Sequence, residues 1–208
     1  MTQPPNLDPV RNYFEERLDA HGTSARGADW NSEASQEARF DQLLKLCDPS
    51  AAFTILDYGS GTGALADYLA KKGFQADYTG FDILEKAIQA AKQQHTGKPG
   101  RTFTAEEASL PVCDYVVASG IFNFRADASF EAWTDYVTDV LRRFDQLSRK
   151  GFASNFLTKY SDADRMRADL YYADPCFLFD YCKRNFSKNV ALLHDYTLYD
   201  FTLLVRKG

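Results

Sequence analysis

Apolar residues recur along the chain in two spacings, which predict strands alternating with helices from residue 53 onward. Short runs that are almost wholly apolar, such as 53–58 and 114–118, are typical of strands covered on both faces. Between such runs, apolar residues recur three or four positions apart, as on one face of a helix; an example is Leu84, Ala87, Ile88 and Ala91. This alternation predicts parallel pairing, right-handed crossovers and a doubly wound α/β sheet.

The segment before the first strand carries two further helical patterns. The first opens at Asp8-Pro9, an N-cap followed by proline, and the second runs from Ser32 to the pair Asp48-Pro49. We therefore expect residues 1–50 to form an N-terminal helical extension or lid, and residues 51–208 to form one ligand-binding domain.

The last two expected strands, 190–194 and 201–205, lie too close together for a parallel pair. Only residues 195–200 separate them, whereas a helical crossover needs about a dozen residues, so the two strands should be antiparallel. The prediction is a mostly parallel seven-stranded sheet with an antiparallel C-terminal strand pair, whose other strands are 53–58, 76–81, 102–105, 114–118 and 152–157.

Composition narrows the range of partners. With 208 residues, 45% hydrophobic and 25% charged, the chain suits one globular domain. Its net charge of -5 and scattered Lys and Arg argue against nucleic acid and favour small molecules. Four cysteines without a C-x-x-C pair and three separated histidines predict neither a metal site nor disulfides. Because no leader pattern or apolar run of ~18 residues is present, we expect a cytoplasmic protein without a membrane span.

The most informative stretch joins the first strand to the following helix. It has the sequence D-Y-G-S-G-T-G and contains Asp57, Gly59, Ser60, Gly61 and Gly63. Glycines at alternate positions serve where the backbone takes positive φ or lies close to a ligand. A helix that begins there directs free N–H groups and its positive dipole end into the same space. We therefore expect a nucleotide-like ligand against this turn.

An acidic residue, Asp82, ends the second expected strand. Its carboxylate is placed to accept hydrogen bonds from both ribose hydroxyls of a nucleotide. Gly59, Gly61 and Ala64 also satisfy the dinucleotide fingerprint with alanine in the third place. The pattern alone therefore leaves both NAD and an adenosyl cofactor open.

Three features together resemble the class I S-adenosylmethionine-dependent methyltransferases. These are the motif D-x-G-x-G-x-G formed by Asp57 with the three glycines, the two helices before it, and the closing strand pair. The resemblance implies a Rossmann-like methyltransferase fold that uses S-adenosylmethionine as cofactor and leaves S-adenosylhomocysteine as product. It covers the layout from residue 53 to the C-terminus, but only the stretches around Asp57 and Asp82 are specific.

The resemblance also implies a role for each matching residue. Asp57 and the backbone of Gly59, Ser60, Gly61 and Gly63 would hold the methionine end of the cofactor. Asp82, with Ile83 beside it, would bind the ribose, and Ser119 and Gly120 would lie beside the sulfonium. Glu106 stands where the family often has an aspartate near the adenine amino group, so glutamate is a departure there. In the N-terminal extension, Trp30 and Arg39 are candidates to close over the cofactor, Arg39 by pairing with its carboxylate.

The sequence says less about the methyl acceptor. Residues 119–123 lack the N-P-P-Y or D-P-P-Y motif of amino-methylating nucleic-acid enzymes, so we expect transfer to an oxygen or nitrogen of a small metabolite. A general base is needed only if the acceptor is a hydroxyl or a protonated amine. The catalytic candidates are His194, oriented by Asp195, together with Tyr172 and Asn123, while Tyr13 and Tyr171 are candidates to roof the pocket.

Two other functions stay open at this point. An NAD(P)-dependent oxidoreductase is disfavoured because nothing after residue 150 resembles a second catalytic domain and no Tyr-x-x-x-Lys pair is present. A non-catalytic module that binds the adenosyl cofactor is the other alternative. The pattern makes no prediction of the oligomeric state.

Overall fold

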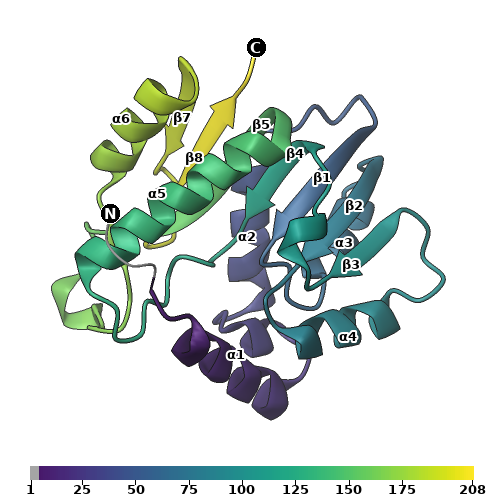
Figure 1. The fold of residues 1–208 in the computed structure, drawn as a ribbon, viewed down its shortest axis with the longest axis horizontal. Coiled ribbons are helices and arrows are strands. Elements are labelled where there is room, and N and C mark those ends of the chain that lie inside the picture. Colours follow the sequence, from purple (N-terminus) through teal and green to yellow (C-terminus); the bar gives the residue numbers. More distant parts are fainter. Residues whose placement is uncertain (1–4) are drawn as a thin grey trace.

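A computed structural model describes residues 5–208 and shows a sheet in the order β3-β2-β1-β4-β5-β8-β7 (Figure 1). The parallel part of the sheet comprises β1 (Phe53–Tyr58), β2 (Ala76–Phe81), β3 (Arg101–Thr104), β4 (Cys113–Ala118) and β5 (Ser148–Thr158). At its edge, β8 (Asp200–Arg206) pairs antiparallel with both β5 and β7 (Asn189–Leu193). The predicted sheet is therefore confirmed. Its strand order reverses between β1 and β4, where ligands of such sheets usually bind.

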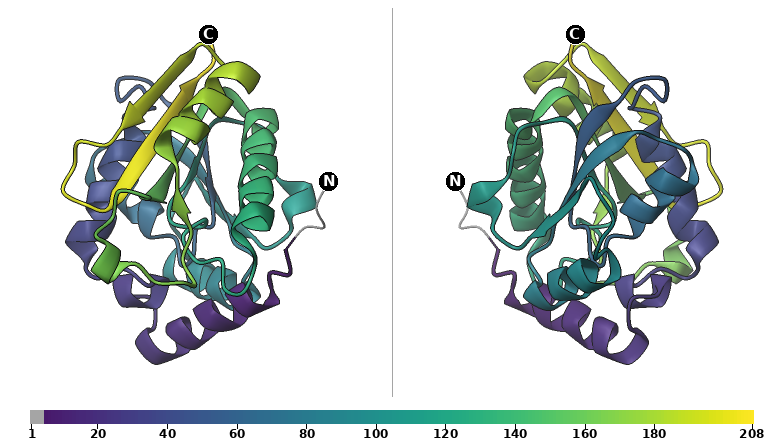
Figure 2. Two further views of the ribbon diagram at one scale, coloured as in Figure 1. Left: turned by 90° about the vertical axis from the view of Figure 1, so that its left-hand side faces the viewer. Right: turned by 90° about the vertical axis from the view of Figure 1, so that its right-hand side faces the viewer.

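Helices cover both faces of the sheet (Figure 2). On one face lie α2 (Glu33–Leu44), α3 (Ala64–Lys71) and α4 (Glu85–Gln94), and on the other lie α5 (Phe130–Leu147) and α6 (Pro175–Asn185). Successive side chains of a strand point to opposite faces of the sheet and so enter different cores. In β1, Ile55 packs with the first set of helices and Leu56 with the second. These two cores hold the ends of β1 and β4 in fixed positions.

The remaining helix, α1 (Asp8–His21), and the short 3-10 helix η1 (Ala25–Ala28) lie across the end of the sheet rather than on either face (Figure 1). The loops that follow β1, β2 and β4 meet α1 there and enclose a pocket together with it. The two predicted N-terminal helices thus have different places, because α2 belongs to a core and α1 covers the pocket.

The structure corrects three local predictions. Leu7, not Asp8, is the N-cap of α1, and the backbone N–H of Asp8 donates to Asn6 instead. β5 begins four residues before the expected start at 152, because Ser148 and Gly151 pair with β4 on either side of an irregularity that contains the charged, exposed Arg149 and Lys150. The second predicted helix, α2, ends at Leu44, before the expected end at Asp48-Pro49. The stretch after β5 contains the 3-10 helix η3 (Ala163–Arg165) and β6 (Tyr172–Ala173), which pairs with β5. Another 3-10 helix, η2 (Glu107–Ser109), precedes β4.

Candidate functional site

The glycine turn after β1 forms the floor of the pocket. Gly59, Gly61 and Gly63 have φ values of 86°, 52° and 86°, which side chains other than glycine rarely adopt. At Gly59 a Cβ atom would also lie only 2.1 Å from a methyl carbon of Ile121. Among residues 5–208, no side chain caps the N-terminus of α3 at Gly63. The N–H groups of Gly63 and Ala66 bond to backbone carbonyls, so those of Ala64 and Leu65 are the ones that a ligand could bind.

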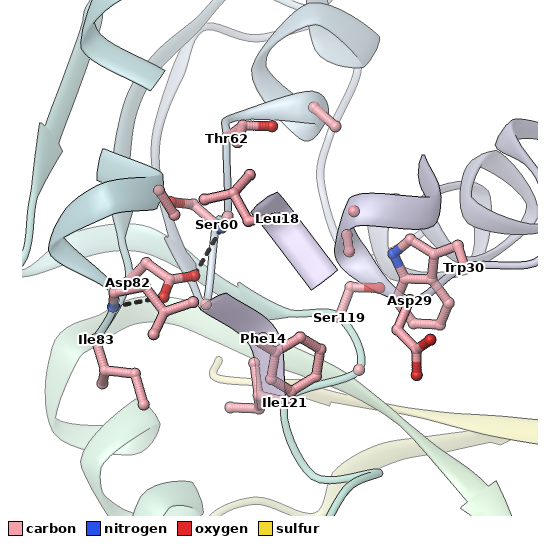
Figure 3. A pocket seen from close by; sticks show the side chains of 18 of the residues that line it. Phe14, Leu18, Asp29, Trp30, Ser60, Thr62, Asp82, Ile83, Ser119 and Ile121 are labelled. Carbon is pink, nitrogen blue, oxygen red and sulfur yellow. Dashed lines mark hydrogen bonds between the residues drawn. The ribbon is translucent and has the colours of Figure 1, made fainter. Parts of the chain in front are cut away.

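Asp82 lies at the end of β2, beside this turn (Figure 3). One carboxylate oxygen accepts the backbone N–H of Gly61 at 2.8 Å, and the other accepts that of Leu84 at 2.9 Å. Burial raises the pKa of Asp82, although these backbone N–H groups oppose the shift. Each oxygen keeps a second lone pair, so the carboxylate can still accept two hydroxyl groups of a ligand.

Asp57 lies deeper, near the end of strand β1 and two residues before Gly59. It is buried, and the hydroxyl of Tyr78 on β2 donates to its Oδ2 at 2.7 Å. Burial raises the pKa of Asp57 to about 7, and the nearby charge of Asp82 acts in the same direction. A cationic group of a ligand placed against Asp57 would favour its ionised form.

The end of β4 forms the opposite wall of the pocket. Asn155, in β5, accepts the backbone N–H of Gly120 at 2.8 Å and donates to the hydroxyl of Ser119 at 3.1 Å. Gly120 has a φ of 78°, and a Cβ atom there would lie 2.5 Å from the indole of Trp30. Trp30 thus packs against the backbone of β4's end. Asn155 was not among the predicted site residues, although an asparagine inside the apolar run 152–157 indicates such a role.

His95 is a second residue that the sequence analysis did not select. Its side chain is buried behind the glycine turn, with Nε2 3.2 Å from the carbonyl oxygen of Thr62 and Nδ1 2.6 Å from the guanidinium of Arg101. Burial lowers the pKa of His95, which favours the neutral ring. A neutral ring donates through one nitrogen and accepts through the other, which matches these two partners and fixes the turn.

Arg39 does not reach the pocket in the way expected. Its guanidinium is buried against the carboxylate of Asp200 in β8, donates to the carbonyl of Ser35 at 2.8 Å, and lies 4.2 Å from the centre of the Trp30 ring. The predicted pairing with a cofactor carboxylate therefore does not fit this position, because the guanidinium already neutralises Asp200. Arg39 instead supports Trp30 from behind.

Other predicted residues also lie outside the pocket lining. Glu106 is exposed at the start of η2, and His194 is exposed after β7, beside the ring of Tyr160. The hydroxyl of Tyr172 accepts the backbone N–H of Arg167 instead of facing the pocket. These positions do not suit the adenine and catalytic roles that were predicted, because none of these side chains contacts the pocket. Of the three catalytic candidates, Asn123 alone lines it.

The two tyrosines expected to roof the pocket have structural partners. Tyr171 is buried with its hydroxyl 2.9 Å from that of Thr134. Tyr13, in α1, donates to Asp29 at 2.8 Å and stacks on Phe124 with ring centres 4.2 Å apart. Asp29, which lines the pocket, is also paired with Arg17 at 3.0 Å. Tyr13 thus joins α1 to the loop that carries Trp30.

The charged side chains that line the pocket in the described part of the chain are all acidic. Over residues 5–208, its lining contains the carboxylates of Asp29, Asp57 and Asp82 but no Lys, Arg or His. In the same described part of the chain, no group of three His, Cys, Asp or Glu side chains is arranged to hold a metal ion. Nor does that part contain a helix with the length and apolar character that crossing a membrane requires.

Comparisons with known proteins agree with this geometry. A family model described as a methyltransferase domain matches residues 49–130. The curated protein named "Putative methyltransferase Rv1506c", from Mycobacterium tuberculosis, is 48% identical over 167 residues, which cover 80% of this chain and 99% of that protein.

Solved structures share the fold at low sequence identity. The N-methyltransferase NodS of Bradyrhizobium japonicum, in complex with S-adenosyl-L-homocysteine, has a TM-score of 0.66 at 14% identity, covering 96% of this chain and 98% of its own. The magnesium protoporphyrin IX methyltransferase of Synechocystis has a TM-score of 0.67 at 18% identity, covering 98% and 100%. For the 1,6-didemethyltoxoflavin-N1-methyltransferase of Burkholderia thailandensis the TM-score is 0.63 at 18% identity, covering 99% and 93%.

Proposed function

The chain belongs to the S-adenosylmethionine-dependent methyltransferase family, and from this premise we propose that it methylates an oxygen or nitrogen of a small-molecule metabolite. The observation that carries the proposal is the pocket beneath α1, which joins the glycine turn and Asp82 to an apolar lining at the β1–β4 switch point. Such a covered pocket suits a cofactor together with a small acceptor, rather than a polymer.

The residues of the pocket fit an adenosyl cofactor. Asp82 keeps two lone pairs for the ribose hydroxyls, and Asp57 offers a buried carboxylate for the methionine ammonium. The backbone from Gly59 to Gly63 can approach a ligand closely at the three glycines, because these residues have no side chain of their own. When bound, the cofactor supplies an electrophilic methyl group on a positively charged sulfur.

The protein's contribution to such a transfer is chiefly orientation. Methyl transfer needs an in-line approach of the acceptor, and holding two reactants in this geometry supplies much of the acceleration. We propose that Ser119 and Gly120 border the reacting centre, because Asn155 fixes their backbone and Trp30 packs against it. Water is excluded on the same side by α1, which we propose acts as a lid.

The known ligands and names of similar structures are consistent with a small acceptor. The Burkholderia enzyme was crystallised with bound 1,6-didemethyltoxoflavin and S-adenosylhomocysteine, and the Synechocystis enzyme is named for magnesium protoporphyrin IX. The net charge of -5 supports the same choice, since phosphates would be repelled.

Two measurements test the proposal. Calorimetry should show binding of S-adenosylhomocysteine but not of NADH; the reverse result would contradict a methyltransferase. Incubation with cofactor labelled in its methyl group and a metabolite extract should then label a small molecule. Label found only in protein or nucleic acid would rule out a small-molecule acceptor.

A further inference from the structure

One group of pocket residues provides flat apolar surfaces. Phe14 of α1 and Phe124 after β4 meet edge to face, with ring centres 6.3 Å apart, and Tyr13 stacks behind Phe124. Trp133 and Tyr136 of α5 contribute two more aromatic rings to the lining. Because each ring is held by a neighbour, these surfaces are preformed. They favour a flat, largely apolar ligand.

The charges around the pocket restrict such a ligand further. No cationic side chain in the described chain lines the pocket, so a phosphate or carboxylate on the ligand would meet only like charges. Asp57 and Asp82 belong to the cofactor-binding part. Both oxygens of Asp29 are already engaged, one by Tyr13 and the other by Arg17. The pocket therefore selects an acceptor without negative charge.

Asn123 offers a hydrogen-bond acceptor that the protein itself does not use. Its backbone is held on both sides, since its N–H donates to Gly120 at 3.2 Å and its carbonyl accepts the N–H of Tyr171 at 2.8 Å. The side-chain oxygen is buried and has no hydrogen-bond partner among residues 5–208. A buried acceptor without a donor is unfavourable, and rotation of the amide group would turn the oxygen toward a ligand's N–H or O–H in the pocket.

A base for deprotonating a hydroxyl is missing from this part of the pocket. Burial raises the pKa of Tyr136 to about 12, so its phenol stays protonated at neutral pH. Histidine is absent from the described lining, Asp29 is paired with Tyr13 and Arg17, and the proposed function assigns Asp57 and Asp82 to the cofactor. A hydroxyl needs such a base, whereas the lone pair of a neutral amine attacks without one.

We infer that the methyl acceptor is an uncharged aromatic or heteroaromatic amine, bound between the aromatic rings with an N–H donated to the side-chain oxygen of Asn123. This inference rests on the proposed function. In the transfer, the nitrogen lone pair forms the new N–C bond while the S–C bond breaks and leaves its electrons on sulfur. The additional proton on the product nitrogen then passes to water.

Three naphthalene derivatives, 1-naphthylamine, 1-naphthoate and 1-naphthol, test this inference. Their binding is measured by calorimetry on protein saturated with S-adenosylhomocysteine. 1-Naphthylamine is neutral at pH 7 and should bind at least roughly ten times more tightly than the anion 1-naphthoate. Equal or tighter binding of 1-naphthoate, or no binding of any of the three, would overturn the inference. With labelled cofactor, methylation of the oxygen of 1-naphthol at pH 7 would also overturn it.

A variant isolates the contribution of Asn123. Asn123→Leu should weaken binding of 1-naphthylamine by about five-fold, while affinity for S-adenosylhomocysteine stays within about two-fold and shows that the fold is intact. Asn185→Leu, at an exposed position at the end of α6, is the control and should bind both ligands like the parent protein. Unchanged amine binding in Asn123→Leu would contradict the role of Asn123. If S-adenosylhomocysteine does not bind the parent protein, the proposed function itself fails.

Discussion

The hydroxyl of Tyr78 donates a hydrogen bond to the carboxylate of Asp57 at 2.7 Å, from the neighbouring strand β2 to the end of β1. Both side chains are buried, and the pKa of Asp57 is raised to about 7, mainly by that burial. The donor keeps one carboxylate oxygen oriented while the charge itself has no cationic partner among the residues of the pocket. Asp57 can therefore bind a positively charged ligand, but its buried charge lowers the stability of the protein without ligand.

This arrangement predicts a pH dependence of stability. Folding raises the pKa of Asp57 from its ordinary 3.8 to about 7, so its contribution to stability is fully present below about pH 4 and is lost as pH rises through about 7. Asp57→Asn keeps the acceptor for Tyr78 and removes the charge. Urea unfolding without ligand should therefore show that the variant gains stability relative to the parent protein as pH rises from about 4 to about 7. A constant difference across that range would mean that Asp57 does not titrate there.

Asp82 and Glu106 provide a matched pair of acidic residues for testing the cofactor site. Asp82→Ala should weaken binding of S-adenosylhomocysteine by about 1–3 kcal/mol, because two charge-assisted hydrogen bonds to the ribose are lost. Glu106→Ala removes an exposed carboxylate outside the pocket lining and should leave the dissociation constant unchanged. Calorimetry distinguishes the two. If Glu106→Ala gives the larger effect, the family's adenine position is used here despite its exposure in the structure.

The buried pair formed by Arg39 and Asp200 predicts a large effect on stability. Arg39→Met leaves the carboxylate of Asp200 buried without its cation, and should lower the free energy of unfolding by about 3–5 kcal/mol. Adding Asp200→Asn should restore part of this loss, since the isolated charge is then removed. The exposed pair of Arg11 and Asp8 is the control, and Arg11→Met should change stability by about 1 kcal/mol or less. Denaturant unfolding of the four proteins measures these differences.

His194 gives a prediction of no effect. Because this residue is exposed and does not line the pocket, His194→Ala should leave the turnover number within about two-fold of the parent value. The measurement uses the small-molecule acceptor found with labelled cofactor. A loss of about 100-fold or more would indicate that the loop between β7 and β8 moves to the pocket during turnover.

The parts of the fold that follow from local spacing could be predicted from the sequence. The apolar run at 53–58, the glycines after it and the six-residue connection near the C-terminus each contain their own structural information. The charged start of β5 could not be found in this way, because Arg149 and Lys150 are exposed and lie at an irregularity between the paired residues Ser148 and Gly151.

The candidate site also contains some residues whose roles could be predicted from the sequence and others whose roles could not. Gly59, Gly61 and Asp82 lie close to one another through a strand–turn–helix pattern that the sequence displays. By contrast, Arg39 was expected to meet a ligand because nothing in the sequence indicates that Asp200 is its partner. His194 was selected for its chemistry at a strand end, whereas its exposure depends on how the β7–β8 connection turns outward. Long-range partners and loop directions depend on packing, which local patterns do not contain.

The pair of Arg39 and Asp200 also sets an order of events during synthesis. The two residues are 161 positions apart, and β8, which carries Asp200, is synthesised after all the other strands of the sheet. Until β8 has joined the sheet, α2 has no partner for its buried guanidinium, and Trp30 lacks the support that holds it against Gly120. A nascent chain therefore completes its cofactor pocket only after its C-terminal strand has emerged, although the glycine turn is made much earlier.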